Sequence, residues 1–302
     1  MSAVRRLAAV DVGSNTVIAL VADLAGGRLV DVGLFEEMPE LGAEVDRTGR
    51  IGPTKTAAAI AALDAVLTPA RTLGYEHLAA GATAAVRRAA DRDEFLDRVT
   101  AAAGVPVRLI GERREAELSF LGVASVHAAE HGWLMGDMGG GSTELVVAEG
   151  ARALRWTSLA VGSGGLASRY LSDPPGPGER ETLRAAAATA LEAAPECDAE
   201  RLVMTGGTAS HLPKVVSRER PPDVVSAAEL RTAIERLDAA PAAELAPGYG
   251  VPAARVRALR AGAEVLLLLL GRYRLDRFHV SHAGLRQGMI LAQVERGDDW
   301  WR

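Results

Sequence analysis

Apolar and polar positions along the chain fall into blocks that predict two successive groups of three strands. Short apolar runs, separated by turns that contain glycine, are typical of neighbouring β-strands. The first group comprises residues 5–11, 16–23 and 28–35, and the second comprises residues 133–137, 143–149 and 152–158. We expect each group to form an antiparallel meander.

Helical patterns alternate with short strands after each predicted meander. The expected helices are 53–73, one from about 83, 92–103, 112–129, 162–171, 178–194, a helix-rich segment over 208–272, and 285–293. The expected further strands are 77–81, 105–110, 202–204 and 277–281, and the expected loops are 36–52 and 172–178. Meanders followed by alternating helix and strand predict the α/β class.

Length and composition limit the possibilities further. A chain of 302 residues suits two domains, and we place them at residues 1–125 with 289–302, and at residues 126–288. The net charge of −5 gives no general attraction to nucleic acid or membrane. Cys197 is the only cysteine, which fits a reducing cytoplasm, and no signal peptide is evident. The longest apolar run, 265–270, is too short to span a bilayer and is expected inside a helix.

One motif joins two predicted strands in the second half of the chain. Its sequence at residues 137–144 is Asp-Met-Gly-Gly-Gly-Ser-Thr-Glu. Three consecutive glycines leave the turn without a Cβ, so that backbone amides can approach an anion closely. Asp137 and Glu144 offer the oxygen ligands that a divalent cation takes. The motif indicates a phosphate and metal site, with a plain glycine-rich hairpin as the alternative.

A similar motif lies near the N-terminus. Asp11, Gly13 and Thr16 repeat the order of acid, glycine and hydroxyl, with apolar runs on either side. Asp11 precedes Asp137 by 126 positions, which is the length of a domain. This repetition indicates a duplication, with two lobes facing a central cleft and two loops that clamp one phosphate chain. Chance similarity between two hairpins is the alternative.

Five segments in order resemble the exopolyphosphatase and guanosine pentaphosphate phosphohydrolase (Ppx/GppA) family, within the superfamily of actin, sugar kinases and heat-shock chaperone ATPases. They resemble the family's ATSAVR, GEEEARLxFLGV, DIGGGSTE, SLPLG and ALREG segments, and they occupy residues 82–87, 111–123, 137–144, 158–162 and 284–288. The resemblance covers essentially the whole chain. It implies two duplicated actin-like ATPase (ribonuclease H-like) domains in the short, two-domain form.

The resemblance also implies an activity, since family members release terminal phosphate from inorganic polyphosphate or guanosine pentaphosphate. Glu115 and Glu144 match the family's two catalytic glutamates. Glu115 would be the general base or orient the water, and Glu144 would position the same water or help to hold the metal. Asp11, Asp137 and Glu144 are the expected ligands of Mg²⁺, with Mn²⁺ as a substitute. Without the resemblance, Glu115 would be interpreted as a solvated helix residue.

A further set of residues is expected to bind phosphate. The loops would supply amides and hydroxyls, and Arg87 and Arg286 would supply guanidinium groups. Arg286 would alternatively pin the helix between the lobes, and Gly207 would alternatively lie in a plain strand-to-helix turn capped by Thr205 or Thr208. The set comprises Gly13, Ser14, Asn15, Thr16, Arg87, Gly139, Gly140, Gly141, Ser142, Thr143, Gly207 and Arg286.

Three positions depart from the family's pattern. Ile18, Glu40 and Gly165 stand where the family often carries a basic residue. Each lost contact to a charged group would weaken binding by about 1.5–3 kcal/mol. We therefore expect the fold and the acids to be retained, and the affinity for long polyphosphate to be reduced.

The departures leave two other functions open. One is a non-catalytic sensor of (p)ppGpp or a related nucleotide, and the other is an ATP-dependent kinase of the same superfamily. The expected partner is the polyphosphate or guanosine polyphosphate substrate, with no nucleic-acid polymer and no membrane. The resemblance further implies a homodimer.

Overall fold

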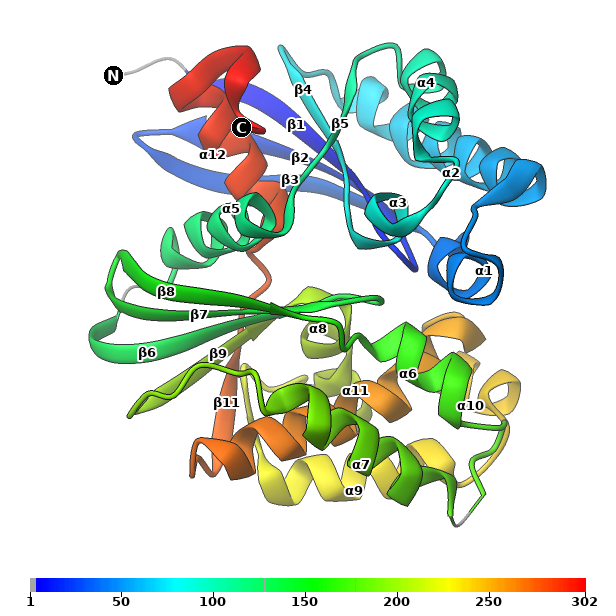
Figure 1. Cartoon of the computed structure of the whole chain (residues 1–302). Helices are drawn as coiled ribbons and strands as arrows, with labels where there is room; N and C mark the ends of the chain where they lie inside the picture. The colour runs from blue at the N-terminus through cyan, green and yellow to red at the C-terminus, as the bar shows by residue number, and fades with distance from the viewer. Residues whose placement is uncertain (1–3, 128, 177) are drawn as a thin grey trace. The chain divides into compact units, whose positions relative to one another are not determined.

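The computed structural model describes residues 4–127, 129–176 and 178–302 (Figure 1). They divide into two compact units, the first made of Met1–Val126 with Ala283–Arg302 and the second of His127–His282. The sequence analysis placed the domain boundaries after residues 125 and 288. The second observed boundary lies earlier, after His282, and the whole last helix therefore belongs to the first unit. Each unit contains one mixed sheet with helices packed on it. The predicted α/β class with two domains is confirmed.

The sheet of the first unit has the strand order β3-β2-β1-β4-β5. The first three strands pair antiparallel as the predicted meander, and β4 and β5 extend the sheet parallel to β1. The strands are β1 (Arg5–Val12), β2 (Val17–Ala25), β3 (Arg28–Glu37), β4 (Leu78–Ala82) and β5 (Val107–Leu109).

Alternate residues of β1 enter two separate cores, because successive side chains of a strand point to opposite faces. Ala8 and Val10 pack with the core that includes α2 and α4, whereas Leu7 and Ala9 pack with α5 and α12 on the other face (Figure 1). By this alternation, Asp11 lies on the face that carries α5. The helices of this unit are α1 (Leu41–Thr48), α2 (Gly52–Leu73), α3 (Ala84–Arg88), α4 (Arg92–Ala103), α5 (Glu112–Ala124) and α12 (Leu285–Arg296).

Two predictions in the first unit were wrong. Residues 36–52 were predicted as a loop but contain α1, which buries only Leu41, Gly42 and Val45 and begins after Glu40 without a capping side chain, so the usual start signal of a helix is missing. The helix predicted over 112–129 ends at Ala124, and β6 already begins at Ala129.

The sheet of the second unit has the strand order β10-β11-β9-β6-β7-β8. The predicted meander is present as β6-β7-β8, and β9 lies parallel to both β6 and β11. The strands are β6 (Ala129–Met138), β7 (Thr143–Gly150), β8 (Arg152–Leu159), β9 (Arg201–Thr205), β10 (Val224–Ser226) and β11 (Arg277–Val280). The short strand β10 was missed, since it lies inside the segment predicted to be helix-rich.

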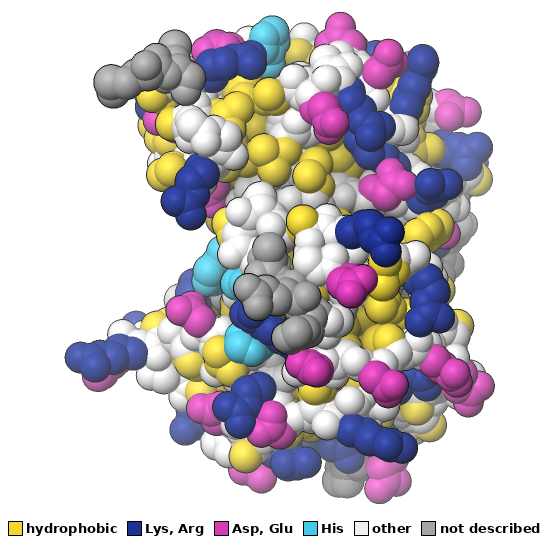
Figure 2. Space-filling view, turned by 90° about the vertical axis from the view of Figure 1, so that its left-hand side faces the viewer, with side chains coloured by type: hydrophobic (Ala, Val, Ile, Leu, Met, Phe, Trp, Pro, Cys, Tyr) yellow, Lys and Arg dark blue, Asp and Glu magenta, His cyan; other side chains and the backbone are white. Residues whose placement is uncertain are grey.

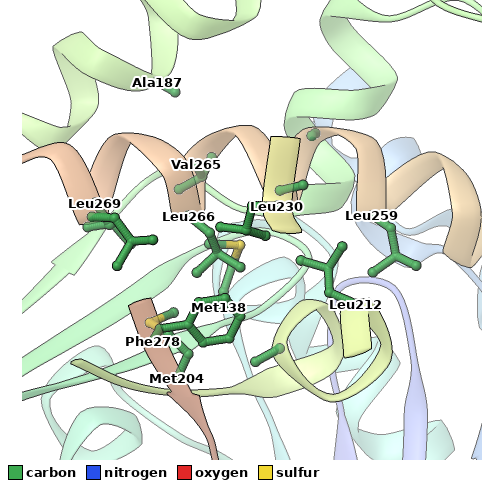
Figure 3. Close-up of a cluster of buried hydrophobic side chains, with 14 of the residues drawn as sticks. Met138, Ala187, Met204, Leu212, Leu230, Leu259, Val265, Leu266, Leu269 and Phe278 are labelled. Atoms are coloured by element: carbon green, nitrogen blue, oxygen red, sulfur yellow. The ribbon is translucent and has the colours of Figure 1, made fainter. Parts of the chain in front are cut away.

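The core of the second unit lies on one face of this sheet (Figure 3). Val265, Leu266 and Leu269 of α11 belong to the same cluster as Met138 of β6, so the apolar run 265–270 lies within a helix as predicted. Because Met138 faces this core, Asp137 points to the opposite face. The helices are α6 (Ser163–Tyr170), α7 (Glu179–Leu191), α8 (Gly206–Val216), α9 (Ala227–Asp238), α10 (Ala242–Tyr249) and α11 (Ala253–Arg272).

The surface mixes charges of both signs. Figure 2 shows lysine and arginine side chains interspersed with acidic ones on the face that it displays.

None of the helices within the described ranges combines the length and the apolarity that crossing a membrane requires. The predicted cytoplasmic location stays a prediction.

Candidate functional site

The two glycine loops close in the same way. In the first unit, the amide of Gly13 donates to the carbonyl of Thr16 at 2.8 Å. In the second unit, the amide of Gly139 donates to the carbonyl of Ser142 at 2.9 Å. The two bonds are shifted by the same 126 positions that separate the two acids. The loops therefore share a backbone geometry as well as a sequence pattern, which supports the duplication.

These closing bonds correct one prediction, that every glycine amide of the loops is available to phosphate. The amides of Gly13 and Gly139 are already engaged by protein carbonyls, and each backbone N–H is a single donor. Six turn amides meet no protein acceptor within the described part of the chain, those of Ser14, Asn15, Thr16, Gly140, Gly141 and Ser142. They are the amides that an anion can use.

A short helix braces each loop. Gly42 in the first turn of α1 donates to the carbonyl of Ser14 at 2.7 Å, and Gly165 in the first turn of α6 donates to the carbonyl of Gly140 at 2.9 Å. These bonds direct loop carbonyls toward the helix, where they cannot repel an anion. A Cβ at Gly162 would collide with the backbone of Gly140, so only glycine permits this approach.

One hydroxyl of the second loop has a structural role instead of the predicted one. Thr143 is fully buried, and its Oγ1 donates to the carbonyl of Val161 at 2.6 Å. Its hydroxyl hydrogen is therefore not available to phosphate. The hydroxyls of Thr16 and Ser142 remain candidates.

Four polar residues lie side by side across the second sheet. Asp137 of β6 is in register with Glu144 of β7 and with Thr205 of β9, and Glu144 is in register with Ser158 of β8. Residues directly opposite on neighbouring strands share a face. We call these four residues the polar row. It brings together two acids that the sequence separates by a tight turn.

The acids of the polar row are well enclosed. Glu144 is 1% exposed, and its Oε1 accepts a hydrogen bond from Ser158 Oγ at 2.8 Å. A Cβ at Gly206, which has a φ of 90°, would lie 2.8 Å from Asp137 Oδ1. Glycine at this position therefore allows both the backbone turn and the close approach of the Asp137 carboxylate.

The carboxylates of Asp137 and Glu144 fit one common mode of Mg²⁺ binding. No group of three or more His, Cys, Asp or Glu side chains within the described ranges is placed to hold a metal ion. Asp137 and Glu144 are a pair, and Mg²⁺ is commonly held by one or two carboxylates while phosphate and water supply the rest. The pair fits that mode and not an all-protein cage.

The first loop lacks the second acid. Asp11 of β1 lies opposite Ile18 of β2, at the place where Asp137 lies opposite Glu144 in the duplicated pair. The two loops share their closing bonds and differ in their acids. Of the two predicted groups of metal ligands, only the one in the second unit is a pair.

Two predicted site residues meet in the first unit. Arg87 of α3 forms an ion pair with Glu115 of α5, and its Nη1 also donates to the carbonyl of Ile110 at 2.9 Å. Glu115 is 7% exposed. Arg87 follows β4 and Glu115 follows β5, so the ends of two parallel strands bring them together.

The helix that carries Glu115 is fixed at both the main chain and a side chain. The amide of Glu115 donates to the carbonyl of Gly111 at 2.8 Å, and this bond closes the first turn of α5. The neighbouring Arg114 is buried and donates through Nε to the carbonyl of Trp300 at 2.9 Å. This tie to the C-terminal segment limits how far α5 can shift.

The turn before α8 contains Gly207, which lies against the guanidinium of the buried Arg255. Thr205 is the N-cap residue of α8, but its side chain makes no capping hydrogen bond. His211, one turn into the helix, is joined through Nδ1 to the carbonyl of Gly207 at 2.9 Å. Burial lowers the pKa of His211 below its ordinary value. The phosphate-binding role of Gly207 stays a prediction.

Arg286 is the second residue of α12 and is half-buried. Its Nε is buried and has no hydrogen-bond partner within the described part of the chain. The structure pairs Arg87 with a predicted acid, whereas no ion pair of Arg286 is found among the described residues. Both alternatives for Arg286, phosphate contact and helix anchoring, stay predictions.

Sequence reasoning missed the residues that support the acids and loops. They are Ser158, Gly162 and Gly165. Ser158 and Gly162 lie in the segment that resembles SLPLG, so its strand-to-helix position was the available signal.

The duplicated sheets and braced glycine loops define a class of protein, the two-domain α/β proteins with the actin-like ATPase fold. Within that class, the Ppx/GppA phosphatase family model matches residues 20–296. The chain belongs to this family.

Individual proteins and structures are also similar to this chain over nearly its whole length. An uncharacterised protein of Streptomyces coelicolor is 32% identical over 98% of this chain and 92% of its own length. Exopolyphosphatase 1 of Mycobacterium tuberculosis is 28% identical over 97% of this chain and 90% of its own. The structure of the Aquifex aeolicus PPX-GPPA enzyme matches with a TM-score of 0.77 at 27% identity, covering 96% of this chain and all of that one.

Proposed function

We propose that this protein is a Mg²⁺-dependent phosphoanhydride hydrolase that releases terminal phosphate from inorganic polyphosphate or guanosine pentaphosphate. The observation that carries the proposal is the enclosed Glu144, in register with Asp137 on the strand that leaves the glycine loop. The similarity to an exopolyphosphatase supports the same class of substrate.

The proposed reaction is an in-line displacement at the terminal phosphorus. The oxygen of a water molecule forms a new P–O bond while the bond to the bridging oxygen breaks. The water proton passes to Glu115, and the shortened chain leaves with the bridging oxygen. Such reactions depend on positioning and charge stabilisation more than on covalent chemistry.

The loops would provide that stabilisation through their backbone. The donors that remain for phosphate oxygens are the amides of Ser14, Asn15, Thr16, Gly140, Gly141 and Ser142. The carbonyls of Ser14 and Gly140 point instead to α1 and α6, whose amides donate to them. The clamping of one phosphate chain by both loops stays a prediction.

Asp137 and Glu144 would hold Mg²⁺, and Asp11 is the further predicted ligand. When bound, the ion would neutralise charge on the phosphate oxygens. The predicted use of Mn²⁺, the homodimer and the cytoplasmic location remain predictions.

The direct test is phosphate release from a panel that runs from pyrophosphate to long polyphosphate and includes guanosine pentaphosphate. We expect release by the native protein and a loss of about 100-fold or more in Glu115→Gln, since general-base groups contribute at least that much. Glu112→Gln is the matched control, because Glu112 is an exposed residue at the start of the same helix. Absence of any Glu115-dependent release would reject the proposal.

A second candidate is a sensor that binds (p)ppGpp without hydrolysing it. The observation that favours it is Ile18 opposite Asp11, where a basic residue is common in the family. A sensor would bind (p)ppGpp in calorimetric titration and release no phosphate from the panel. A protein that binds no (p)ppGpp is not such a sensor.

A further inference from the structure

We infer that Ser158 is a positioning residue that fixes the carboxylate of Glu144. The inference rests on the proposed function, in which Glu144 acts on the attacking water or on the metal. Ser158 itself is assigned no contact with substrate.

The first argument is the hydrogen bond. Ser158 Oγ donates to Glu144 Oε1 at 2.8 Å, and a hydroxyl has one hydrogen to donate. Glu144 is 1% exposed, so bulk water cannot readily replace this donor. A hydrogen-bond donor beside an enclosed carboxylate restricts the orientation of that carboxylate.

The second argument is the register of the strands. Glu144 and Ser158 are direct partners across β7 and β8, and so are the adjacent Thr143 and Leu159. Leu159 is buried in the core on the other face. The segment after Leu159 is held in turn by Thr143 Oγ1, which donates to the carbonyl of Val161. The chain that follows Ser158 is thus fixed at Leu159 and at Val161, although β8 is an edge strand.

The third argument is a comparison with the duplicated unit. The pair that corresponds to Glu144 and Ser158 is Ile18 and Glu36 of β2 and β3. A serine hydroxyl therefore lies beside the acid Glu144 in the second unit, whereas Ile18 in the first unit has no hydroxyl residue opposite it on the neighbouring strand. This distribution is expected if Ser158 serves Glu144 and is not a general feature of the fold.

The test compares the kcat and KM of phosphate release in four variants. Ser158→Ala removes the donor, and Ser158→Thr keeps a hydroxyl and suits a strand. Thr157→Ala is the matched control, because Thr157 is the preceding residue of β8 and its side chain points to the opposite face. Glu144→Gln shows whether Glu144 itself is needed. Thermal unfolding of each variant checks that the fold is retained.

We expect Ser158→Ala to lower kcat by about 10- to 100-fold, as is typical when a group that orients a site ligand is removed. KM should change little, because Ser158 is assigned no contact with substrate. Ser158→Thr should restore most of the activity, and Thr157→Ala should resemble the native protein.

The outcomes separate the inference from the proposed function. If the native protein releases no phosphate, or Glu144→Gln remains fully active, the proposed role of Glu144 is wrong. If Glu144 is required but Ser158→Ala keeps the native kcat, the inference about Ser158 alone is overturned. A loss of kcat in Ser158→Ala that Ser158→Thr does not rescue also overturns it, because a purely structural role would give that result.

Discussion

Arg87 holds Glu115 in an ion pair, although 28 residues separate them in the sequence. The guanidinium is also anchored by the carbonyl of Ile110. A residue predicted to bind phosphate thus contacts the residue predicted to activate water. Both charges are largely enclosed, with 14% of the Arg87 side chain and 9% of the Glu115 side chain exposed. A phosphate group that reaches Arg87 would have to share its guanidinium with Glu115.

Substitution of Arg87 by lysine should lower kcat/KM by about 10- to 100-fold. Lysine keeps the charge but cannot reproduce the planar fork that serves Glu115 and Ile110, and the loss of a hydrogen bond to a charged group corresponds to this range. Steady-state phosphate release measures the effect. Arg88→Lys is the control, since the exposed Arg88 pairs with Asp46. Equal activity in both variants would show that the fork geometry is unimportant.

Substitution of Gly162 by alanine should displace the second glycine loop. The added Cβ would overlap the backbone of Gly140, and forced overpacking typically destabilises by about 1–3 kcal/mol. Urea denaturation should show this loss, together with reduced phosphate release. Gly271→Ala is the matched control, because Gly271 lies in α11 with open space around its Cα. The control should be neutral or up to about 1 kcal/mol more stable.

The stability of the protein should fall in mildly acidic solution, partly through His211. Burial holds the pKa of His211 below its ordinary 6.5 in the folded state. As the pH falls through that value, the unfolded chain takes up a proton that the folded chain does not, so the free energy of unfolding decreases. Urea denaturation at neutral and mildly acidic pH should show a smaller decrease for His211→Gln than for the native protein. His77→Gln, at an exposed position, should behave like the native protein.

Removal of divalent cations should abolish phosphate release, and Mg²⁺ or Mn²⁺ should restore it. Asp137→Asn should raise the Mg²⁺ concentration needed for half-maximal activity by about tenfold or more, because a neutral amide is a weaker ligand for a hard cation. Asp198→Asn is the control, as Asp198 is an exposed acid of the same unit. Full activity after exhaustive chelation would contradict the metal requirement.

The strand order within each meander and the class of the fold were predictable, because alternation and turn residues are local signals. The loops were recognisable for the same reason. The helix α1 and the strand β10 were not, since both are short and depend on packing for their formation. The end of α5 was also misplaced, because nothing local marks it as clearly as a glycine marks the end of α4.

The sequence by itself determined the chemical inventory of the site, namely the acids, the glycine turns and their duplication. Only the tertiary structure decided how these groups are used. The carbonyls of Thr16 and Ser142 engage the amides of Gly13 and Gly139, and strand register sets Ser158 beside Glu144. The physical reason is that a hydrogen bond depends on distance in space, and the partners of these donors and acceptors are fixed by turn closure and strand pairing, which residue identity alone does not specify.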